Sequence, residues 1–336
     1  MHEAVFDRTH LLFFSAVMLF CAVIFSCREK PEQQPQEIIV IEVPEFIQET
    51  ETPQQHAQET PAESGAPGVS HQVQRPLSSM PGLSRIRGRV NSSELDPVNY
   101  NNPDPEILRQ MGVEQYLISY FTGEQFYRSA DYDKALGEYT TSINSNERFI
   151  EAYVSRGNTW MKKREFSRAI DDYTRAIRLD GSRAELYNYR GYSRVEVGQI
   201  TPAIEDFSRA ITINTNYVDA LVNRSHALFQ TGSYDRVIED CTRIISLEPQ
   251  NAVIWNRRGS AWYAKEDDDR AINDFTEAIR LNANYAAAFY NRANSWLNKR
   301  DYERALADIN RCLAINPSYT SAGTTRENIL RARNVN

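Results

Sequence analysis

The segment AVIWNRRGSAWYAKEDDDRAINDFTEAIRLNANY, residues 252–285, shows the pattern that recurs along this 336-residue chain. Its first half places Trp255 and Gly259 four residues apart, with a second tryptophan three residues further on, so the three share one face of a helix. Its second half repeats these intervals from Ala271 through Phe275 to a later alanine. Small residues at Gly259 and Ala271 let two helices approach closely, and the turn between them is polar. The stretch therefore predicts a helical hairpin.

The same pattern occurs six times at a fixed spacing of 34 residues. Small residues occupy the place of Gly259 in every copy: Gly123, Gly157, Gly191, Ser225, Gly259 and Ala293. The copies define units one to six as residues 116–149, 150–183, 184–217, 218–251, 252–285 and 286–319. A hairpin of this length has too little core to fold alone, so we expect neighbouring units to stack into an all-α solenoid.

These units resemble the tetratricopeptide repeat (TPR) family, which places bulky, small and bulky residues on its first helix and alanine, aromatic and alanine on its second. The resemblance implies a right-handed solenoid of six TPR hairpins. An open solenoid end needs a polar outer face. We therefore expect residues 105–115 to form an N-terminal cap and residues 320–336 to form a C-terminal capping helix, in which Ile329 and Leu330 cover the last hairpin.

Unit four departs most from the family pattern. Valine and isoleucine replace its two alanines, and Cys241 replaces the aromatic residue between them. Two larger residues flank one smaller residue, which predicts a volume-conserving repacking. We interpret Cys241 and Cys312 as core thiols that are too far apart for a disulfide. In unit three, Arg194 stands where a bulky apolar residue is usual, so we expect this unit to be looser.

From unit two onward, position 7 of each unit is arginine and position 23 is aspartate. The arginines are Arg156, Arg190, Arg224, Arg258 and Arg292, and the aspartates are Asp172, Asp206, Asp240, Asp274 and Asp308. We predict a structural ladder of ion pairs, within hairpins or across neighbouring units, because a planar guanidinium can grip a carboxylate. An arginine four residues earlier, as in Arg168 and Asp172, is a competing partner. An anion-binding arginine stripe is the functional alternative.

In the TPR family, the first helices line a concave groove that receives peptides or partner segments. The residues that the resemblance assigns to this groove are Asn188, Tyr189, Tyr192, Asn223, His226, Asn256, Arg257, Tyr290, Asn291 and Asn294. Asparagine can both donate to and accept from an extended backbone, and tyrosine adds apolar area with a polar tip. The alternative is that the asparagines only solvate an exposed helix face.

Some TPR proteins carry a carboxylate clamp in this groove, and the clamp is incomplete in this chain. Asn223 and Arg257 fit its pattern, whereas Asn188 and Val253 stand where lysine is usual. His226 is alone among these residues. We interpret it as a polar groove residue rather than a metal ligand.

The N-terminal end carries an apolar run of fifteen residues, LLFFSAVMLFCAVIF at 11–25. A spanning helix needs roughly twenty, so the run is closer to the apolar region of a secretory signal. It ends in Ile24-Phe25-Ser26-Cys27, which resembles the lipobox of bacterial lipoproteins and implies lipidation, such as palmitate, at Cys27. We predict a signal peptide over residues 1–26 and a two-chain lipid anchor. An uncleaved anchor and an ordinary cleaved signal are the alternatives.

Residues 27–104 are rich in Pro, Gln, Glu and Ser, a composition that cannot bury enough apolar surface to fold. We predict a disordered, lipid-tethered linker. One apolar interruption, EIIVIEVPEFI at 37–47, is either a slightly sticky piece of linker or a docking motif for a partner.

The formal net charge of -7 argues against nucleic acid as a general partner. The sequence contains no nucleophile elbow, phosphate loop or metal-ligand spacing, so we predict no catalytic residue, no metal and no cofactor. We expect a membrane-anchored TPR lipoprotein that binds a protein or extended peptide as a scaffold or adaptor at the bacterial cell envelope, with its repeats in the periplasm. The alternative is a transporter-associated component that binds a ligand or a carrier protein.

Overall fold

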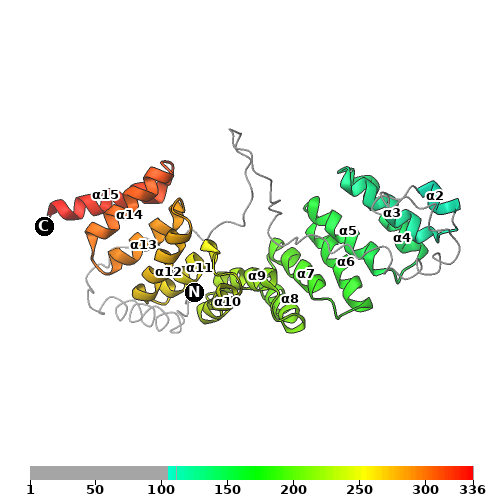
Figure 1. Cartoon of the computed structure of the whole chain (residues 1–336), viewed down its shortest axis with the longest axis horizontal. Helices are drawn as coiled ribbons and strands as arrows, with labels where there is room; N and C mark the ends of the chain where they lie inside the picture. The colour runs from blue at the N-terminus through cyan, green and yellow to red at the C-terminus, as the bar shows by residue number, and fades with distance from the viewer. Residues whose placement is uncertain (1–104, 111, 336) are drawn as a thin grey trace, which may run out of the picture. The chain divides into compact units, whose positions relative to one another are not determined.

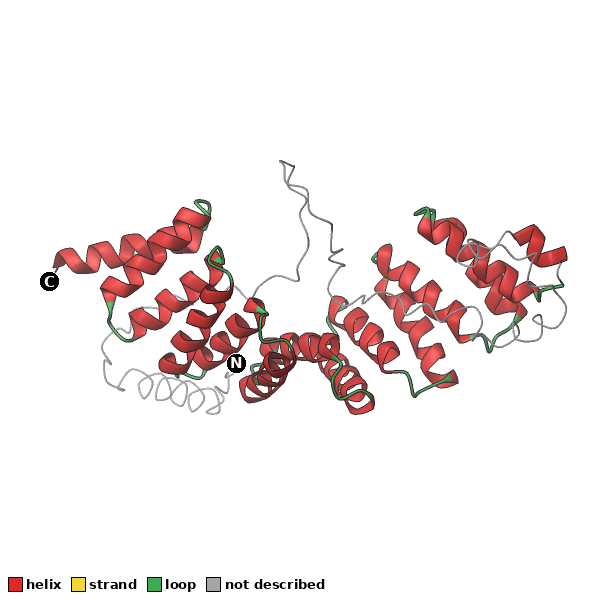
Figure 2. Cartoon of the chain, viewed as in Figure 1, coloured by secondary structure: helices red, strands yellow, loops and turns green. Residues whose placement is uncertain are grey.

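The computed structural model describes residues 105–110 and 112–335, and this part of the chain is helical without strands (Figure 2). Six hairpins follow helix α2 (Pro105–Gln110), and helix α15 (Thr320–Val335) follows them. We call the first helix of each hairpin helix A and the second helix B. The hairpins are α3 (Gln115–Arg128) with α4 (Tyr132–Ser145), α5 (Ile150–Lys162) with α6 (Phe166–Leu179), α7 (Ala184–Glu196) with α8 (Ile200–Ile213), α9 (Val218–Gln230) with α10 (Tyr234–Leu247), α11 (Ala252–Ala264) with α12 (Asp268–Leu281), and α13 (Ala286–Asn298) with α14 (Tyr302–Ile315).

Each helix of the array packs against the next one along the chain, and Figure 1 shows them following one another in chain order. Helices A of consecutive hairpins also contact each other, as α3 does with α5, α7 with α9 and α11 with α13. The predicted solenoid of six hairpins with a further helix at its C-terminal end is confirmed. The predictions for residues 1–26 and 27–104 lie outside the described residues. None of the described helices is long and apolar enough to cross a membrane.

Glycine at position 8 is required by the close approach of the two helices in a hairpin. A Cβ added to Gly191 would lie 2.7 Å from the ring of Phe207, closer than real Cβ contacts. The same holds at Gly259, where the ring of Phe275 would be 2.7 Å away. Both rings are almost completely buried, so neither has room to move.

In unit four, different residues allow helices A and B to approach each other closely. Ser225 has a Cβ where glycine is usual, and Cys241 replaces the large ring opposite it. Cys241 is completely buried between Val237 and Ile244, as the volume-conserving interpretation requires. Burial raises the pKa of the Cys241 thiol to about 12. Cys312 is equally buried, and neither cysteine forms a disulfide, so the prediction of core thiols is confirmed.

The turn between helices A and B places position 15 of every unit in the left-handed region. Only two of these residues are glycines, Gly198 in unit three and Gly232 in unit four. The others are Ala130, Arg164, Glu266 and Arg300, with φ between 59° and 62°. A side chain in this conformation costs on the order of 1 kcal/mol.

Helix α15 continues the repeat beyond the sixth hairpin. Its Ala322 and Ile329 are buried against the preceding hairpin, whereas Leu330 is only half-buried. Arg326 occupies position 7 of this additional helix A, and its Nε donates to Asn310 Oδ1 at 2.8 Å. The capping helix therefore keeps the contact between position 7 and position 25 of the preceding unit, without the bidentate pair to an aspartate.

Candidate functional site

Helices A carry two lines of polar side chains, and the first contains the arginines at position 7. In unit five, Arg258 donates from Nε and Nη2 to the two oxygens of Asp274, both at 2.8 Å. Its Nη1 donates to Thr242 Oγ1 of the preceding unit at 3.0 Å. The same bidentate pair joins Arg156 to Asp172, Arg190 to Asp206, Arg224 to Asp240 and Arg292 to Asp308.

The predicted structural ladder is therefore confirmed, both within hairpins and across units. The competing pair is not formed, because Arg168 pairs with Glu165 at 3.0 Å instead. Burial raises the pKa of the Asp274 carboxyl, and the hydrogen bonds and charge of Arg258 oppose that shift. The guanidinium groups of these arginines are hydrogen-bonded to aspartates within the fold, so the alternative of an anion-binding stripe at position 7 is wrong.

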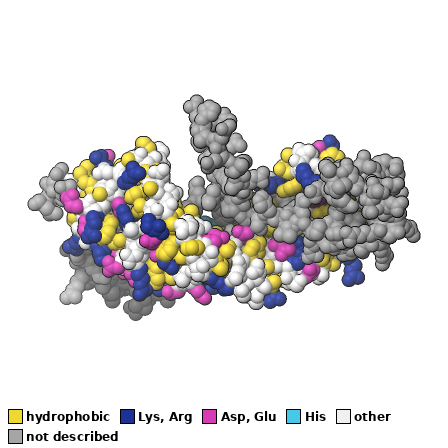
Figure 3. Space-filling view, in the orientation of Figure 1, with side chains coloured by type: hydrophobic (Ala, Val, Ile, Leu, Met, Phe, Trp, Pro, Cys, Tyr) yellow, Lys and Arg dark blue, Asp and Glu magenta, His cyan; other side chains and the backbone are white. Residues whose placement is uncertain are grey.

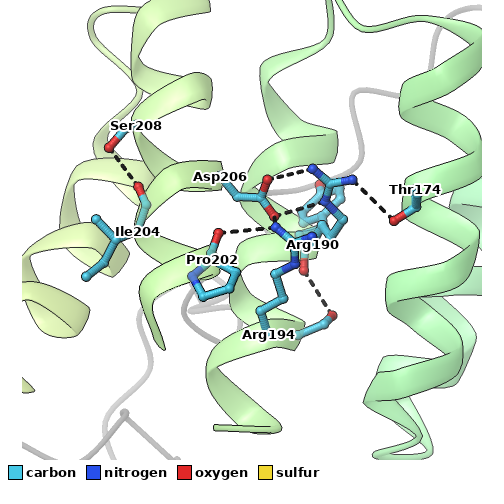
Figure 4. Close-up of polar contacts among 9 residues, drawn as sticks. Thr174, Arg190, Arg194, Pro202, Ile204, Asp206 and Ser208 are labelled. Carbon is cyan, nitrogen blue, oxygen red and sulfur yellow. Dashed lines mark hydrogen bonds and ion pairs between the residues drawn. The ribbon is translucent and has the colours of Figure 1, made fainter. Parts of the chain in front are cut away.

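Unit three adds a second arginine to its ladder carboxylate, as Figure 4 shows. Arg194 Nη1 lies 2.7 Å from Asp206 Oδ2 and 3.2 Å from the backbone oxygen of Pro202. The sequence led us to expect a looser unit because Arg194 replaces a bulky apolar residue. Its pairing with a buried carboxylate removes the reason for that expectation.

The second line lies where helices A of neighbouring units meet, at positions 5, 6 and 9, and we call it the inner line. In the pair of units three and four, Asn223 Nδ2 donates to Asn188 Oδ1 at 3.0 Å. In the pair of units five and six, Asn291 Nδ2 donates to Asn256 Oδ1 at 3.1 Å. Nδ2 of each accepting asparagine lies 3.4 Å from a tyrosine hydroxyl: Asn188 from that of Tyr217, and Asn256 from that of Tyr285. The contacts of this inner line therefore repeat every 68 residues, which is two units.

Most of the residues predicted for the groove are buried in this inner line. Eight of the ten are no more than 6 % exposed: Asn188, Tyr189, Asn223, Asn256, Arg257, Tyr290, Asn291 and Asn294. Tyr192 and His226 are half-buried. The alternative that the asparagines only solvate an exposed helix face is therefore wrong, and the assignment of the ten residues to a peptide-binding groove stays a prediction. The physical reason is that successive helices A pack closely enough to bond to one another.

Position 6 alternates between two kinds of side chain, and this alternation is visible in the sequence, although our prediction of the groove did not include it. Units two, four and six have a small polar residue there: Ser155, Asn223 and Asn291. Units one, three and five have a large one: Phe121, Tyr189 and Arg257. Tyr189 and Arg257 contact the preceding unit. The Tyr189 ring lies 5.6 Å from that of Tyr173, and Arg257 Nη1 donates to Val222 O at 3.0 Å and to Ser225 Oγ at 2.9 Å.

Arg257 differs from the ladder arginines because it has no acidic partner within the described residues. Within these residues Arg257 donates hydrogen bonds only from Nη1, and its Nε is buried without a partner. Burial lowers the pKa of Arg257. Burial and the nearby Arg257 charge together lower the pKa of His226 to about 4. A buried charge without a counter-charge is destabilising by several kcal/mol.

Two more polar atoms near the C-terminal end of the inner line have no partner in the described chain. Asn291 accepts no hydrogen bond at Oδ1, and Asn294 donates none from Nδ2. The bond from Asn291 Nδ2 to Asn256 fixes which way the Asn291 amide points. We call Arg257, Asn291 and Asn294 the unsatisfied cluster. It lies on α11 and α13, and it combines donors with an acceptor.

Other kinds of site find little support in the described part of the chain. No group of three or more His, Cys, Asp or Glu residues there could hold a metal ion. On the face drawn in Figure 3, basic and acidic side chains are interspersed over the described helices. The inner line and its unsatisfied cluster are therefore the best candidate for a functional surface.

Stacked hairpins of this kind define the class of the fold as a helical-repeat solenoid. Tetratricopeptide repeat models match residues 218–251 and 286–319, which are units four and six. The fold is similar to the C-terminal part of a TPR repeat-containing protein from Cytophaga hutchinsonii, with a TM-score of 0.56, 21% identity and coverage of 65% of this chain and 90% of that one. It is also similar to YrrB, described as a TPR protein with an unusual peptide-binding site, with a TM-score of 0.52, 21% identity and coverage of 56% and 97%. No curated protein matches the sequence.

Tetratricopeptide repeats are thus present in this chain, and the fold they form is typically a non-catalytic scaffold for protein interactions. The match to unit four is informative, because this unit departs most from the family pattern in its core. Its hairpin keeps the register while its packing residues change.

Proposed function

We propose that this protein is a non-enzymatic scaffold that binds an extended segment of a partner protein along the inner line of units five and six. The observation that carries the proposal is the unsatisfied cluster. The equivalent side chains of units three and four are Tyr189, Asn223 and His226, and none of these three has a buried polar atom without a partner. Polar atoms that are buried without partners are rare in folded proteins and are costly, so a bound partner would supply what the fold omits.

The chemistry of the cluster suits a peptide backbone. Asn291 Oδ1 is an unused acceptor for a backbone N–H, and Asn294, three residues further along α13, has an unused donor at Nδ2 for a backbone oxygen. Both atoms are buried in the array, so binding requires α11 and α13 to separate locally. Arg257 adds a cation for a carboxylate or a backbone oxygen. YrrB is described as having a peptide-binding site on a similar fold, which is compatible with this use of the repeats.

The proposal places the scaffold at a bacterial membrane. Its support is the sequence at Ile24-Phe25-Ser26-Cys27 after an apolar run of signal-peptide length. A diacylated Cys27 would anchor the chain stably and would hold the repeats in the periplasm. In a membrane fractionation of the natural host, Cys27→Ala should release the protein or block its maturation. Unchanged fractionation and electrophoretic mobility would contradict lipidation.

Partner capture tests the binding proposal. The full-length chain is purified in detergent and used to capture proteins from solubilised membranes, with captured proteins quantified by mass spectrometry. Arg257→Leu and Asn294→Leu should each reduce the same captured proteins. Arg311→Leu and Asn328→Leu make the same chemical changes at exposed residues outside the inner line and should reduce none of them. Equal capture by all four variants would contradict the assignment of the surface.

A further inference from the structure

Lysine–aspartate bridges join neighbouring turns on the side of the array where helix A of each unit is followed by helix B. In each bridge, a lysine at position 14 of one unit pairs with an aspartate at position 18 of the preceding unit. The pairs are Lys163 with Asp133, Lys265 with Asp235, and Lys299 with Asp269. They tie unit one to two, four to five, and five to six. We call this side of the array the turn edge.

The junction of units three and four has uncharged residues at both of these positions. Position 18 of unit three is Thr201 and position 14 of unit four is Thr231, and both are exposed. In the described part of the chain, no ion pair joins these two units, whereas each of the other four junctions has at least one. The two turns also have glycine in the left-handed conformation, Gly198 and Gly232, where the other four have a larger residue. The turn edge is therefore held less firmly at this junction.

The junction of units five and six is the matched case, because it repeats the same inner contacts two units later. Both junctions have an asparagine–asparagine bond in the inner line and a bond from the arginine at position 7 to a hydroxyl at position 25 of the preceding unit. The later junction adds contacts at the turn edge. Lys299 Nζ lies 2.6 Å from Asp269 Oδ1, and Asn298 Nδ2 donates to Asp268 Oδ1 at 3.3 Å. The two junctions therefore match in the inner line and differ at the turn edge.

The apolar contacts across the junction of units three and four lie at the other end of the hairpins. Ala210 and Ile211, near the end of α8, belong to the same buried cluster as Ala220 and Leu221, near the start of α9. Helix α9 ends at Gln230. Nine residues of helix, roughly 13 Å in length, separate Leu221 from that end. The two units can therefore stay packed at one end while the turn edge opens at the other.

We propose that the array bends at the junction of units three and four, by opening at the turn edge while the apolar cluster and the asparagine bond remain in place. The bend divides the scaffold into two arms, units one to three and units four to six. The second arm carries the proposed binding surface, so bending changes the direction in which that surface faces relative to the first arm. The inference does not depend on what the surface binds.

Hydrogen exchange of the full-length chain in detergent tests the opening of the turn edge. After correction for intrinsic rates, the amides of residues 230–236, at the turn of unit four, should exchange at least about threefold faster than those of residues 298–304, the matched turn of unit six. Combining Thr201→Asp with Thr231→Lys installs the bridge and should remove most of this difference. The neutral combination of Thr201→Asn with Thr231→Gln is the control and should leave the difference unchanged.

Distances between spin labels test whether the opening bends the array. Labels introduced as non-canonical amino acids at Asp171 and Glu239 span units two to four, and labels at Glu239 and Ala307 span units four to six. All three residues are exposed and occupy position 22 of their units. The first distance distribution should be the broader one, and the installed bridge should narrow it without changing the second.

Three results would overturn the proposal. Equal exchange at the two matched turns would show that the turn edge is closed as firmly in the middle of the array as at its end. Distance distributions of equal width would show that faster exchange reflects only local fraying of the turn. A broad first distribution that the installed bridge leaves unchanged would place the flexibility elsewhere in units two to four.

Discussion

Residues 184–251 and 252–319 are two copies of one double hairpin, and their inner lines differ at one decisive position. Tyr189 of the first copy packs against the ring of Tyr173, whereas Arg257 of the second occupies the equivalent place and bonds through Nη1 alone. Both side chains are 6 % exposed. The comparison shows that this place requires a large side chain, and that a neutral one meets the requirement. The charge of Arg257 is therefore additional to what packing needs.

The adjacent residue shows what a structural arginine looks like in the same helix. Arg258 binds both oxygens of Asp274 and one threonine hydroxyl. Two neighbouring arginines in one helix thus have opposite relations to the fold: one is fully partnered, and the other is buried without a counter-charge. Matched substitutions in the two copies test this contrast.

The largest effect is expected from Arg258→Leu. The change leaves the Asp274 carboxylate buried without a cation, which should lower the free energy of unfolding by about 3–5 kcal/mol. Denaturant titration at neutral pH, followed by circular dichroism, measures the loss. The matched variant Arg190→Leu should lose less, because Arg194 still pairs with Asp206 at 2.7 Å. Equal losses in the two variants would contradict the role given to Arg194.

A smaller loss is expected at the asparagine pair of the first copy. Asn223→Leu removes the donor to Asn188 Oδ1 and should lower the free energy of unfolding by about 1–3 kcal/mol. Asn294→Leu in the second copy should change it little, since Asn294 Nδ2 has no partner to lose. The same titration compares the two. A loss at Asn294 as large as that at Asn223 would show that Asn294 is satisfied within the fold.

The two copies should also differ in their response to pH, through position 9. His226 has a folded-state pKa of about 4, whereas an unfolded histidine titrates near 6.5. The unfolded state therefore binds the proton first. The contribution of His226 to the free energy of unfolding is fully present above about pH 6.5 and is lost toward pH 4, by at most about 1.4 kcal/mol per pH unit. Asn294, its counterpart in the second copy, carries no titratable group.

Comparing unfolding curves of the natural chain and His226→Gln at pH 7, 6, 5 and 4 measures this contribution. The free energy of the natural chain should fall more steeply than that of the variant. Parallel pH dependences would contradict the pKa assigned to His226.

The smallest effect is expected at the turns. Glu266 has a φ of 62°, and its counterpart in the first copy is Gly198. Glu266→Gly relieves the left-handed conformation of a non-glycine residue and should raise the free energy of unfolding by about 1 kcal/mol. The reverse change, Gly198→Glu, should lower it by a similar amount. Thermal denaturation measures both, and a Glu266→Gly variant that is less stable than the natural chain would contradict this account of the turn.

The sequence was sufficient to predict the hairpins, their register and the ion-pair ladder. Glycine opposite an aromatic ring, as at Gly191 and Phe207, encodes helix contact within one unit, and the Arg–Asp spacing encodes a contact within the same unit. Each of these signals is complete within 34 residues. The capping helix was predictable for the same reason, because its apolar residues follow the helix A pattern.

The inner line could not be predicted in the same way, because its contacts join different units. Whether Asn188 faces solvent or Asn223 depends on how closely two successive helices A pack, and a single unit does not encode that distance. The alternation at position 6 was present in the sequence, but its meaning becomes clear only when Asn223 and Asn291 are seen to bond backward along the array. The lipid anchor, the linker and peptide binding by the ten groove residues remain predictions.

We propose that Arg257 serves binding rather than folding, and the variant Arg257→Tyr distinguishes these two roles. The variant gives the second copy the residue that the first copy has at Tyr189. The measurement is the free energy of unfolding of the full-length chain by denaturant titration, compared with the natural protein. We predict that it is unchanged or increased. A decrease of more than about 2 kcal/mol, the size expected when a needed buried hydrogen-bonding group is lost, would contradict the claim and make Arg257 a structural residue.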